Sequence, residues 1–209
     1  MKIALILIAI ALLAWLAWTI VSVKGIEEPA YTVLEKKSGY EVREYAPYIV
    51  AQVTVTGSQD EALNQGFRYL AGYIFWGNTK KQSIAMTAPV SDITPASQSI
   101  QMTVPVIDIQ KSQNTHVIQF TMPKEFTLDT LPKPNDNKVT FAQVPKAKKA
   151  VLRYSWWATE ERVSAKKEEL QKLLDADKLK TVGDMISAQY NPPWSIPFMR
   201  RNEIIVEVQ

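Results

Sequence analysis

The sequence predicts a single α+β domain whose antiparallel sheet curls into an open barrel, flanked by two long helices and preceded by one N-terminal transmembrane helix. Three observations lead to this prediction. Residues 3–23 form an uncharged apolar stretch, capping patterns at Ser58 and Thr159 each open a helix, and short β-rich segments surround both helices. Residues 27–209 are numerous enough to form one hydrophobic core.

The apolar stretch has the length and composition of a membrane anchor. Its sequence, IALILIAIALLAWLAWTIVSV, runs 21 positions without a charged side chain. At about 1.5 Å per residue, such a helix crosses a hydrocarbon core about 30 Å thick. A cleavable signal peptide has a shorter apolar core and small residues before the cut, whereas this stretch ends in bulky residues such as Trp15 and Trp18. We therefore expect residues 1–26 to stay on the mature protein as an uncleaved anchor.

The flanking charges predict the direction of the anchor. Lys2 and the terminal amine precede the apolar stretch, whereas Lys24 after it is offset by Glu27 and Glu28. The more positive end of a transmembrane helix usually stays in the cytoplasm. We therefore expect residues 27–209 to lie outside the cytoplasm, in the periplasm if the protein is bacterial.

Composition excludes several classes of function. Residues 27–209 carry 22 basic side chains against 21 acidic ones, because two of the 24 basic residues belong to the anchor. They lack the basic surplus of a nucleic-acid-binding domain. With no Cys and one His, the chain cannot form a disulfide, a thiolate nucleophile, an iron–sulfur cluster or a multi-histidine metal site. The acidic pairs Glu160/Glu161 and Glu168/Glu169 lack the spacing of a calcium loop, so we expect no metal site.

The first half of the domain reads as two strands followed by a helix. Residues 40–45 (YEVREY) and 48–56 (YIVAQVTVT) are β-branched or aromatic segments separated by a proline. Ser58 and Glu61 form a capping-box pattern that opens a helix of about 16 residues, which ends near Gly77.

This helix has two apolar stripes at helical spacing. The first stripe is Leu63, Phe67, Leu70 and Ile74. The second stripe is Ala62, Gly66, Tyr69, Tyr73 and Trp76. A helix lying on one sheet needs only one apolar face. The second stripe therefore forms either a second packing layer or a ligand surface, and core packing is the more ordinary of the two.

The middle of the chain contains a short internal repeat. Residues 84–90 (IAMTAPV) and 100–106 (IQMTVPV) match at five of seven positions and predict two short strands with proline near their ends. A strand over 116–122 follows, and then a proline-rich connection over 123–136 that is neither helix nor central strand.

The second half repeats the order of the first. Thr159 is the expected N-cap of a helix that runs to about Asp175. The expected strands of this half cover residues 139–144, 149–157, 184–190 and 203–208. Each half then reads strand, strand, helix, strand, strand, with an additional strand between them. The domain is therefore expected to consist of two pseudo-repeats in element order, without repetition of the sequence itself.

Five segments together resemble the SOUL/heme-binding protein family. They are YEVREY at 40–45, the helix end at Gly77-Asn78, IAMTAPV at 84–90, YNPP at 190–193 and RRNE at 200–203. They occur in the family's order and spacing, across about residues 30–208. The resemblance implies a distorted antiparallel β-barrel flanked by two long helices, which binds heme or free porphyrins without known chemistry on them.

The resemblance also implies where a tetrapyrrole lies, namely on an apolar surface between the first long helix and the C-terminal loop. The residues that it places there are Asn64, Phe67, Arg68, Ala71, Trp194, Ser195, Ile196 and Arg200. A porphyrin is a flat apolar disc with two propionates, so Phe67 and Trp194 suit its faces while Arg68 and Arg200 suit the propionates. Two alternatives stay open: Phe67 is an ordinary core side chain, and Arg200 with Arg201 pins the turn into the last strand.

The resemblance does not supply a histidine ligand for iron. Some family members carry a His within the segment that reads YEVREY here, and Glu44 stands at that place. The only histidine, His116, lies at the start of a strand, where a surface position is more ordinary than ligation. We therefore expect heme or free porphyrin to bind without a protein His axial ligand.

Two functions compete at this point. The first is a membrane-anchored tetrapyrrole-binding protein that acts as a carrier, buffer or scavenger, without catalysis. The second is a ligand-free protein-interaction module that uses exposed aromatic residues, namely Tyr69, Tyr73, Trp76, Trp156 and Trp157. An enzyme is the least expected, because no nucleophile and base with an orienting third group are evident in the sequence.

Overall fold

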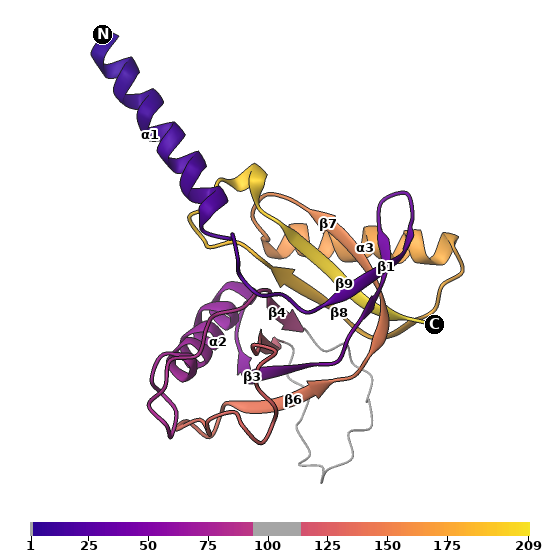
Figure 1. Cartoon of the computed structure of the whole chain (residues 1–209). Helices are drawn as coiled ribbons and strands as arrows, with labels where there is room; N and C mark the ends of the chain where they lie inside the picture. The colour runs from indigo at the N-terminus through magenta and orange to yellow at the C-terminus, as the bar shows by residue number, and fades with distance from the viewer. Residues whose placement is uncertain (1, 94–113) are drawn as a thin grey trace.

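The computed structural model describes residues 2–93 and 114–209 of the chain. Helix α1 (Lys2–Val21) projects away from an α+β domain that contains a nine-stranded sheet and two long helices, α2 (Gln59–Ile74) and α3 (Glu160–Ala176) (Figure 1). The prediction of an α+β fold with an N-terminal apolar helix is confirmed. The strand expected over 100–106 lies outside the described residues.

The sheet is antiparallel throughout and displays the two pseudo-repeats in its topology. Its strands are β1 (Tyr31–Lys36), β2 (Glu41–Tyr45), β3 (Tyr48–Thr56), β4 (Val90–Ile93), β5 (Thr115–Thr121), β6 (Thr140–Val144), β7 (Ala147–Tyr154), β8 (Thr181–Gln189) and β9 (Asn202–Val208). Their order is β1-β2-β7-β9-β8-β4-β5-β3-β6. The strands of the first half correspond to those of the second in the pairs β2/β6, β3/β7, β4/β8 and β5/β9. When the two members of each pair are exchanged, the order without β1 reads the same in reverse. The two halves meet where β4 pairs with β8.

The sheet is not closed, so the barrel that the sequence and the resemblance predicted is shown only as a nine-stranded antiparallel sheet. The edge strands β1 and β6 have one partner each, β2 and β3 respectively, in the part of the chain that the structure describes. Strand β1 was not predicted, because all six of its residues are exposed and it has no buried face to produce a periodic pattern. Alternation along a strand reports which face is buried, but it carries no information on whether two distant edges meet.

The segment 84–90 is also different from the prediction, since only its last residue begins a strand. The peptide bond between Ala88 and Pro89 is cis, and the Thr87 hydroxyl donates a hydrogen bond to the carbonyl of Thr121 on β5. The segment therefore joins α2 to β4 as a packed turn. Proline lacks the N–H that an internal strand position would need.

Each long helix covers one half of the sheet. Helix α2 packs on β3 and β5, and α3 packs on β8 and β9. Both predicted caps are present: the backbone N–H of Ser58 donates to Glu61 Oε2 at 3.0 Å, and the hydroxyl of Thr159 accepts from the N–H of Arg162 at 3.4 Å. Bonds of this kind satisfy N–H groups that a helix leaves free at its start.

Core packing accounts for most of the second stripe of α2. Three of the five residues of this stripe, Ala62, Gly66 and Tyr73, are buried. The other buried residues of α2 are Gln59, Leu70 and Ile74. An ideal Cβ on Gly66 would lie 2.4 Å from Ile118 Cγ1, so α2 approaches β5 more closely than any side chain at this position would allow. Glycine therefore sets the distance between the helix and the sheet.

We expect Gly66→Ala to lower the free energy of unfolding by about 1–3 kcal/mol, because the added methyl forces Ile118 or the helix to move. Gly72→Ala is the matched control on the same helix, since a Cβ there has no atom within 4 Å. It should raise stability by about 0.5–1 kcal/mol through the lower entropy of the unfolded chain. Thermal unfolding of both variants in detergent, followed by circular dichroism, checks the opposite signs; equal shifts would contradict the close approach.

Candidate functional site

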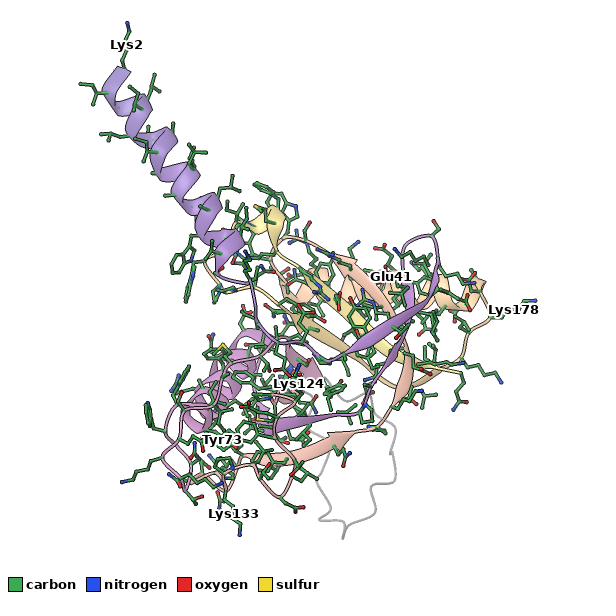
Figure 2. The ribbon with its side chains drawn as sticks, viewed as in Figure 1. Lys2, Glu41, Tyr73, Lys124, Lys133 and Lys178 are labelled. Atoms are coloured by element: carbon green, nitrogen blue, oxygen red, sulfur yellow. The ribbon has the colours of Figure 1, made fainter. Side chains whose placement is uncertain are left out.

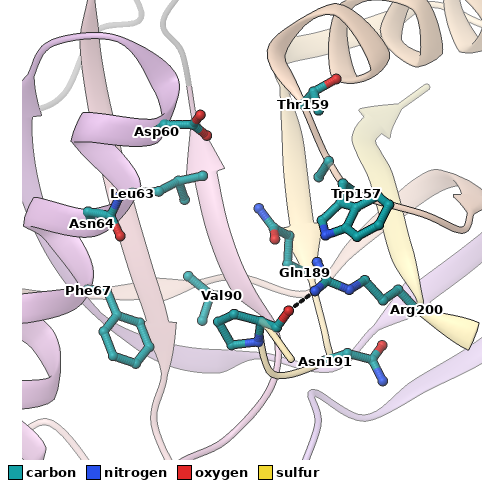
Figure 3. Close-up of a pocket in the computed structure, with 12 residues that line it drawn as sticks. Asp60, Leu63, Asn64, Phe67, Val90, Trp157, Thr159, Gln189, Asn191 and Arg200 are labelled. Atoms are coloured by element: carbon teal, nitrogen blue, oxygen red, sulfur yellow. Dashed lines mark hydrogen bonds between the residues drawn. The ribbon is translucent and has the colours of Figure 1, made fainter. Parts of the chain in front are cut away.

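A cleft of about 550 Å³ lies between α2 and two loops of the C-terminal half (Figure 3). Its volume falls within the range of about 300–1,000 Å³ that is typical of small-molecule sites. The walls are mostly apolar, with polar groups between them. The lining residues are Asp60, Leu63, Asn64, Phe67, Val90, Trp157, Ala158, Thr159, Gln189, Asn191, Pro193 and Arg200.

The α2 wall is formed by side chains three and four positions apart, which share one helix face. Leu63, Asn64 and Phe67 line the cleft from this face. Phe67 is 43% exposed, and its ring packs edge-on against Phe120 of β5 with 5.4 Å between centroids. Phe67 is therefore not an ordinary core residue, because it packs against the core on one side and forms an aromatic wall of the cleft on the other.

The opposite wall is the loop after β7, which carries Trp157. Trp157 is 48% exposed, and its carbonyl accepts a hydrogen bond from Arg162 Nη1 at 2.7 Å. The neighbouring Trp156 makes two hydrogen bonds through its backbone: its N–H donates to the Pro197 carbonyl at 2.8 Å, and its carbonyl accepts from Asn202 Nδ2 at 2.7 Å.

 The φ of Trp156 is 77°, a left-handed value that these two bonds hold in place. The loop is thus tied to the segment that follows β8 and to the start of β9.

A fully buried carboxylate holds the loop between β8 and β9. Glu203 Oε2 accepts a hydrogen bond from the Tyr190 hydroxyl at 2.6 Å, and Oε1 accepts from Arg43 Nη1 at 3.1 Å and from Arg201 Nε at 3.0 Å. Arg201 also pairs with Glu28, in the connection between α1 and β1, at 2.9 Å. Burial alone would lower the pKa of both arginines, but the charge of Glu203 and the interactions with the other neighbouring groups together outweigh burial, so the pKa of each is raised.

The segments that carried the resemblance converge on this carboxylate. Arg43 and Tyr45 come from YEVREY, Tyr190 from YNPP and Glu203 from RRNE, and the Arg43 guanidinium also donates to the Tyr45 hydroxyl at 3.2 Å. Ala88 of IAMTAPV packs in the same cluster as both tyrosines. Most of these motif side chains therefore support the loop that borders the cleft, and do not form its walls.

A sequence model described as SOUL heme-binding protein matches residues 26–207. The chain belongs to this SOUL family. The family suggests that the protein binds heme or a related tetrapyrrole, and it agrees with the resemblance seen in the sequence motifs. No curated protein sequence matches the chain.

Solved structures share the fold of this SOUL protein at low sequence identity. The C-terminal domain of EcmrR is 11% identical with a TM-score of 0.60, and the match covers 86% of this chain and 98% of that one. A hydrolase from Listeria innocua is 9% identical with a TM-score of 0.54, over 84% of this chain and 94% of that one. At such identities the likeness shows the fold alone.

The residues that the SOUL resemblance places at the ligand and the residues that line the cleft overlap in part. Of the eight residues expected at the ligand, those that line the cleft are Asn64, Phe67 and Arg200. The others lie on the same two segments but outside the lining and are Arg68, Ala71, Trp194, Ser195 and Ile196. The sequence places the wall residue Trp157 only in a possible protein-interaction surface, because nothing in its local sequence shows that its loop faces α2.

Three of the expected loop residues face α1 or the loop interior. The Trp194 carbonyl accepts a hydrogen bond from Trp15 Nε1 at 2.9 Å, and the Ile196 N–H donates to Thr19 Oγ1 at 3.2 Å. Ser195 is buried, and its hydroxyl has no hydrogen-bond partner among the residues that the structure describes.

Arg200 both lines the cleft and pins its loop. Its Nε donates to the Ser195 carbonyl at 3.2 Å, Nη2 donates to the Pro193 carbonyl, and the guanidinium lies 5.5 Å from the centroid of the Trp157 ring (Figure 3). Burial lowers its pKa. The alternative that Arg200 and Arg201 pin the turn is therefore supported, and for Arg200 it coexists with a place in the cleft.

His116 is buried, which corrects the expectation of a surface residue. Its Nδ1 lies 3.0 Å from Asp92 Oδ1, and burial raises the pKa of that carboxyl, while the bond to His116 opposes the rise. The pairing of β5 with β4 brings the two together beneath the helices. His116 lines a separate cavity of about 210 Å³ near the starts of α2 and α3, together with Lys167.

A larger cavity of about 690 Å³ suits a tetrapyrrole less well than the cleft does. It lies between the segment before β1 and the loop after β5, and its charged lining residues are Glu27, Glu28, Lys124 and Asp129. Three carboxylates against one ammonium would repel propionates. The cleft beside α2, in contrast, has one carboxylate and one guanidinium among its lining residues.

We expect His116→Ala to lower the free energy of unfolding by about 1–3 kcal/mol at neutral pH, because Asp92 stays buried without its partner. A carboxyl whose pKa is raised on folding contributes stability below its ordinary pKa and loses that contribution as pH rises through the folded value. The loss of His116 raises the pKa of Asp92 further, because the bond to His116 opposes the rise. The difference in free energy of unfolding between the variant and the wild type should therefore shrink toward pH 4.

Urea unfolding at both pH values measures the deficit. In the double variant His116→Ala, Asp92→Ala, the loss should be smaller than the sum of the single losses. The absorption spectrum of the hemin complex should not change in His116→Ala. Loss of a low-spin spectrum in this variant would instead make His116 an iron ligand.

Proposed function

We propose that this protein is a membrane-anchored tetrapyrrole-binding protein that holds heme or porphyrin in the cleft beside α2. It acts as a carrier, buffer or scavenger outside the cytoplasm, without catalysis. The observation that carries the proposal is an apolar cleft between two aromatic walls, Phe67 and Trp157, in a chain of the SOUL family.

The residues of the cleft fit a porphyrin ring. Figure 3 shows Phe67 on the α2 side and Trp157 with Arg200 on the loop side, so apolar surface is available to a flat ligand from both directions. The two hydrogen bonds of Arg200 use two of the five N–H donors of a guanidinium. The other three are available to a propionate, for which the planar guanidinium is a suitable partner.

Binding in this cleft does not depend on an iron ligand from the protein. The twelve lining residues include no His, Met, Cys or Tyr, which are the usual axial ligands of heme. Heme supplies redox and oxygen chemistry when it is bound, whereas the cleft itself offers only Asp60 and Arg200 as ionisable groups. This supports storage or transfer over catalysis, and it predicts that metal-free porphyrins bind as well.

The anchor part of the proposal rests on α1. This helix is long and apolar enough to cross a membrane, and its side chains are almost all exposed. A core helix of a soluble protein would be buried. The positive charge of Lys2 supports an orientation with the domain outside the cytoplasm.

We expect Phe67→Ala and Trp157→Ala each to weaken hemin binding about 5- to 150-fold, since each removes apolar contact worth about 1–3 kcal/mol. Titrations followed by the Soret band, with the full chain in lipid nanodiscs and empty nanodiscs as the blank, measure the change. Phe126→Ala is the control, because Phe126 is a partly buried aromatic that lines the larger cavity.

The control distinguishes the two cavities. If Phe126→Ala weakens binding while Phe67→Ala and Trp157→Ala do not, the larger cavity is the site. If the wild-type chain produces only a non-saturating change, the protein is better described as an interaction module without a ligand.

We expect the mature protein to retain α1, because the segment has spanning length and no small-residue cleavage site. The chain should resist extraction from membranes by alkaline carbonate, and mass spectrometry should find the N-terminus before Trp15. A mature N-terminus between Trp18 and Glu28, or release of the intact chain by carbonate, would contradict the anchor.

A further inference from the structure

The C-terminal end of α1 is hydrogen-bonded to the loop between β8 and β9, which borders the cleft. Trp15 Nε1 donates to the Trp194 carbonyl at 2.9 Å, and Thr19 Oγ1 accepts from the Ile196 N–H at 3.2 Å. Thr19 is the one buried residue of α1. The last two turns of α1 therefore touch the domain, while the rest of the helix extends freely to Lys2 (Figure 2).

The free part of α1 is too short to cross a bilayer by itself. The 13 residues from Lys2 to Ala14 measure about 20 Å at 1.5 Å per residue, against a hydrocarbon core of about 30 Å. Spanning therefore requires Trp15 and the turns after it to enter the membrane. Trp15 precedes the helix end at Val21 by six residues, or about 9 Å. If α1 spans the bilayer, the loop that is hydrogen-bonded to Trp15 must therefore enter the membrane to a similar depth.

Exposed aromatic side chains surround this point. We call them the aromatic rim, and its members are Trp15, Trp18, Trp156, Trp157, Trp194 and Phe198. Trp194 and Phe198, each 61% exposed, lie on the loop that holds α1. The loop after β7, which carries Trp156 and Trp157, lies in the same region, because the Trp156 N–H donates to the Pro197 carbonyl at 2.8 Å.

We propose that the aromatic rim lies in the interface of the bilayer that α1 crosses, so that the cleft opens beside the membrane surface. The inference rests on the proposed anchor and adds a second contact between the domain and lipid. Tryptophan favours the interface, where its ring meets apolar chains and its N–H meets polar groups. Interfacial elements typically descend about 5–10 Å, which agrees with the depth that the length of α1 requires.

This placement brings the ligand and the membrane together. Trp157 belongs to the rim and is also a wall of the cleft, and Pro193 lines the cleft next to the rim residue Trp194. A flat amphiphilic ligand that is dissolved in the bilayer would then enter the cleft without crossing bulk water. The substrate class of the site becomes membrane-partitioned tetrapyrroles, taken directly from lipid.

Depth-dependent quenching of tryptophan fluorescence tests the proposal. Full-length variants that retain only Trp194, only Trp18 or only Trp76, with Phe at the other tryptophan positions, are placed in phosphatidylcholine–phosphatidylglycerol vesicles. A nitroxide near the headgroup end of the acyl chains is the quencher. We expect it to quench Trp194 and Trp18 but not Trp76, an exposed residue after α2 that is not part of the rim.

The outcomes separate the inference from the anchor. If Trp18 is quenched and Trp194 is not, the anchor holds and the inference is overturned. If neither is quenched, both fail. If Trp194 is shielded from aqueous iodide but not quenched by the lipid nitroxide, a second copy or another protein covers the rim and the inference is again overturned.

A second measurement keeps the test independent of multiple tryptophan substitutions. Since the chain has no cysteine, Phe198→Cys and Lys172→Cys each accept one spin label, and Lys172 is an exposed position on α3. Collision with dissolved oxygen should exceed collision with a water-soluble nickel complex at position 198, with the reverse at position 172. Preference for nickel at both positions would overturn the inference.

Discussion

The buried carboxylate of Glu203 is the interaction on which the rest of the site depends. It sits on a central strand with two arginines and a tyrosine around it, and these partners come from β2 and from the two ends of the loop between β8 and β9. Removal of one partner of a buried ion pair typically costs about 3–5 kcal/mol, because the remaining charge stays desolvated. The network therefore allows one arrangement of this loop and strongly disfavours others.

The same network connects the apolar helix α1 with the cleft. Arg201 pairs with Glu28 in the segment that follows α1, and the loop between Tyr190 and Arg201 binds α1 at one point and borders the cleft at another. One short loop thus contacts the apolar helix α1, the buried ion cluster and the cleft.

The two pseudo-repeats use one topology for different purposes. In both halves a helix covers two strands of its own half. Helix α3 is largely polar outside its buried residues Val163, Leu170 and Leu174. Helix α2 buries its small and aromatic stripe by means of Gly66 and keeps Phe67 beside the cleft. The difference follows from side-chain size on the two helix faces and not from the order of the elements.

Sequence alone determined most of the local elements, the apolar helix, the two caps, the pseudo-repeats and the family, because each depends on neighbouring residues or on short motifs. Phe67 and Arg200 were found through the resemblance, and their surroundings were not. The open sheet, the exposed edge strand β1, the burial of His116 against Asp92 and the position of Trp157 came from the tertiary structure alone. These features join residues that are far apart in the chain, and no local pattern records which distant segments pack together. The contact between Trp15 and Trp194, 179 residues apart, is of the same kind.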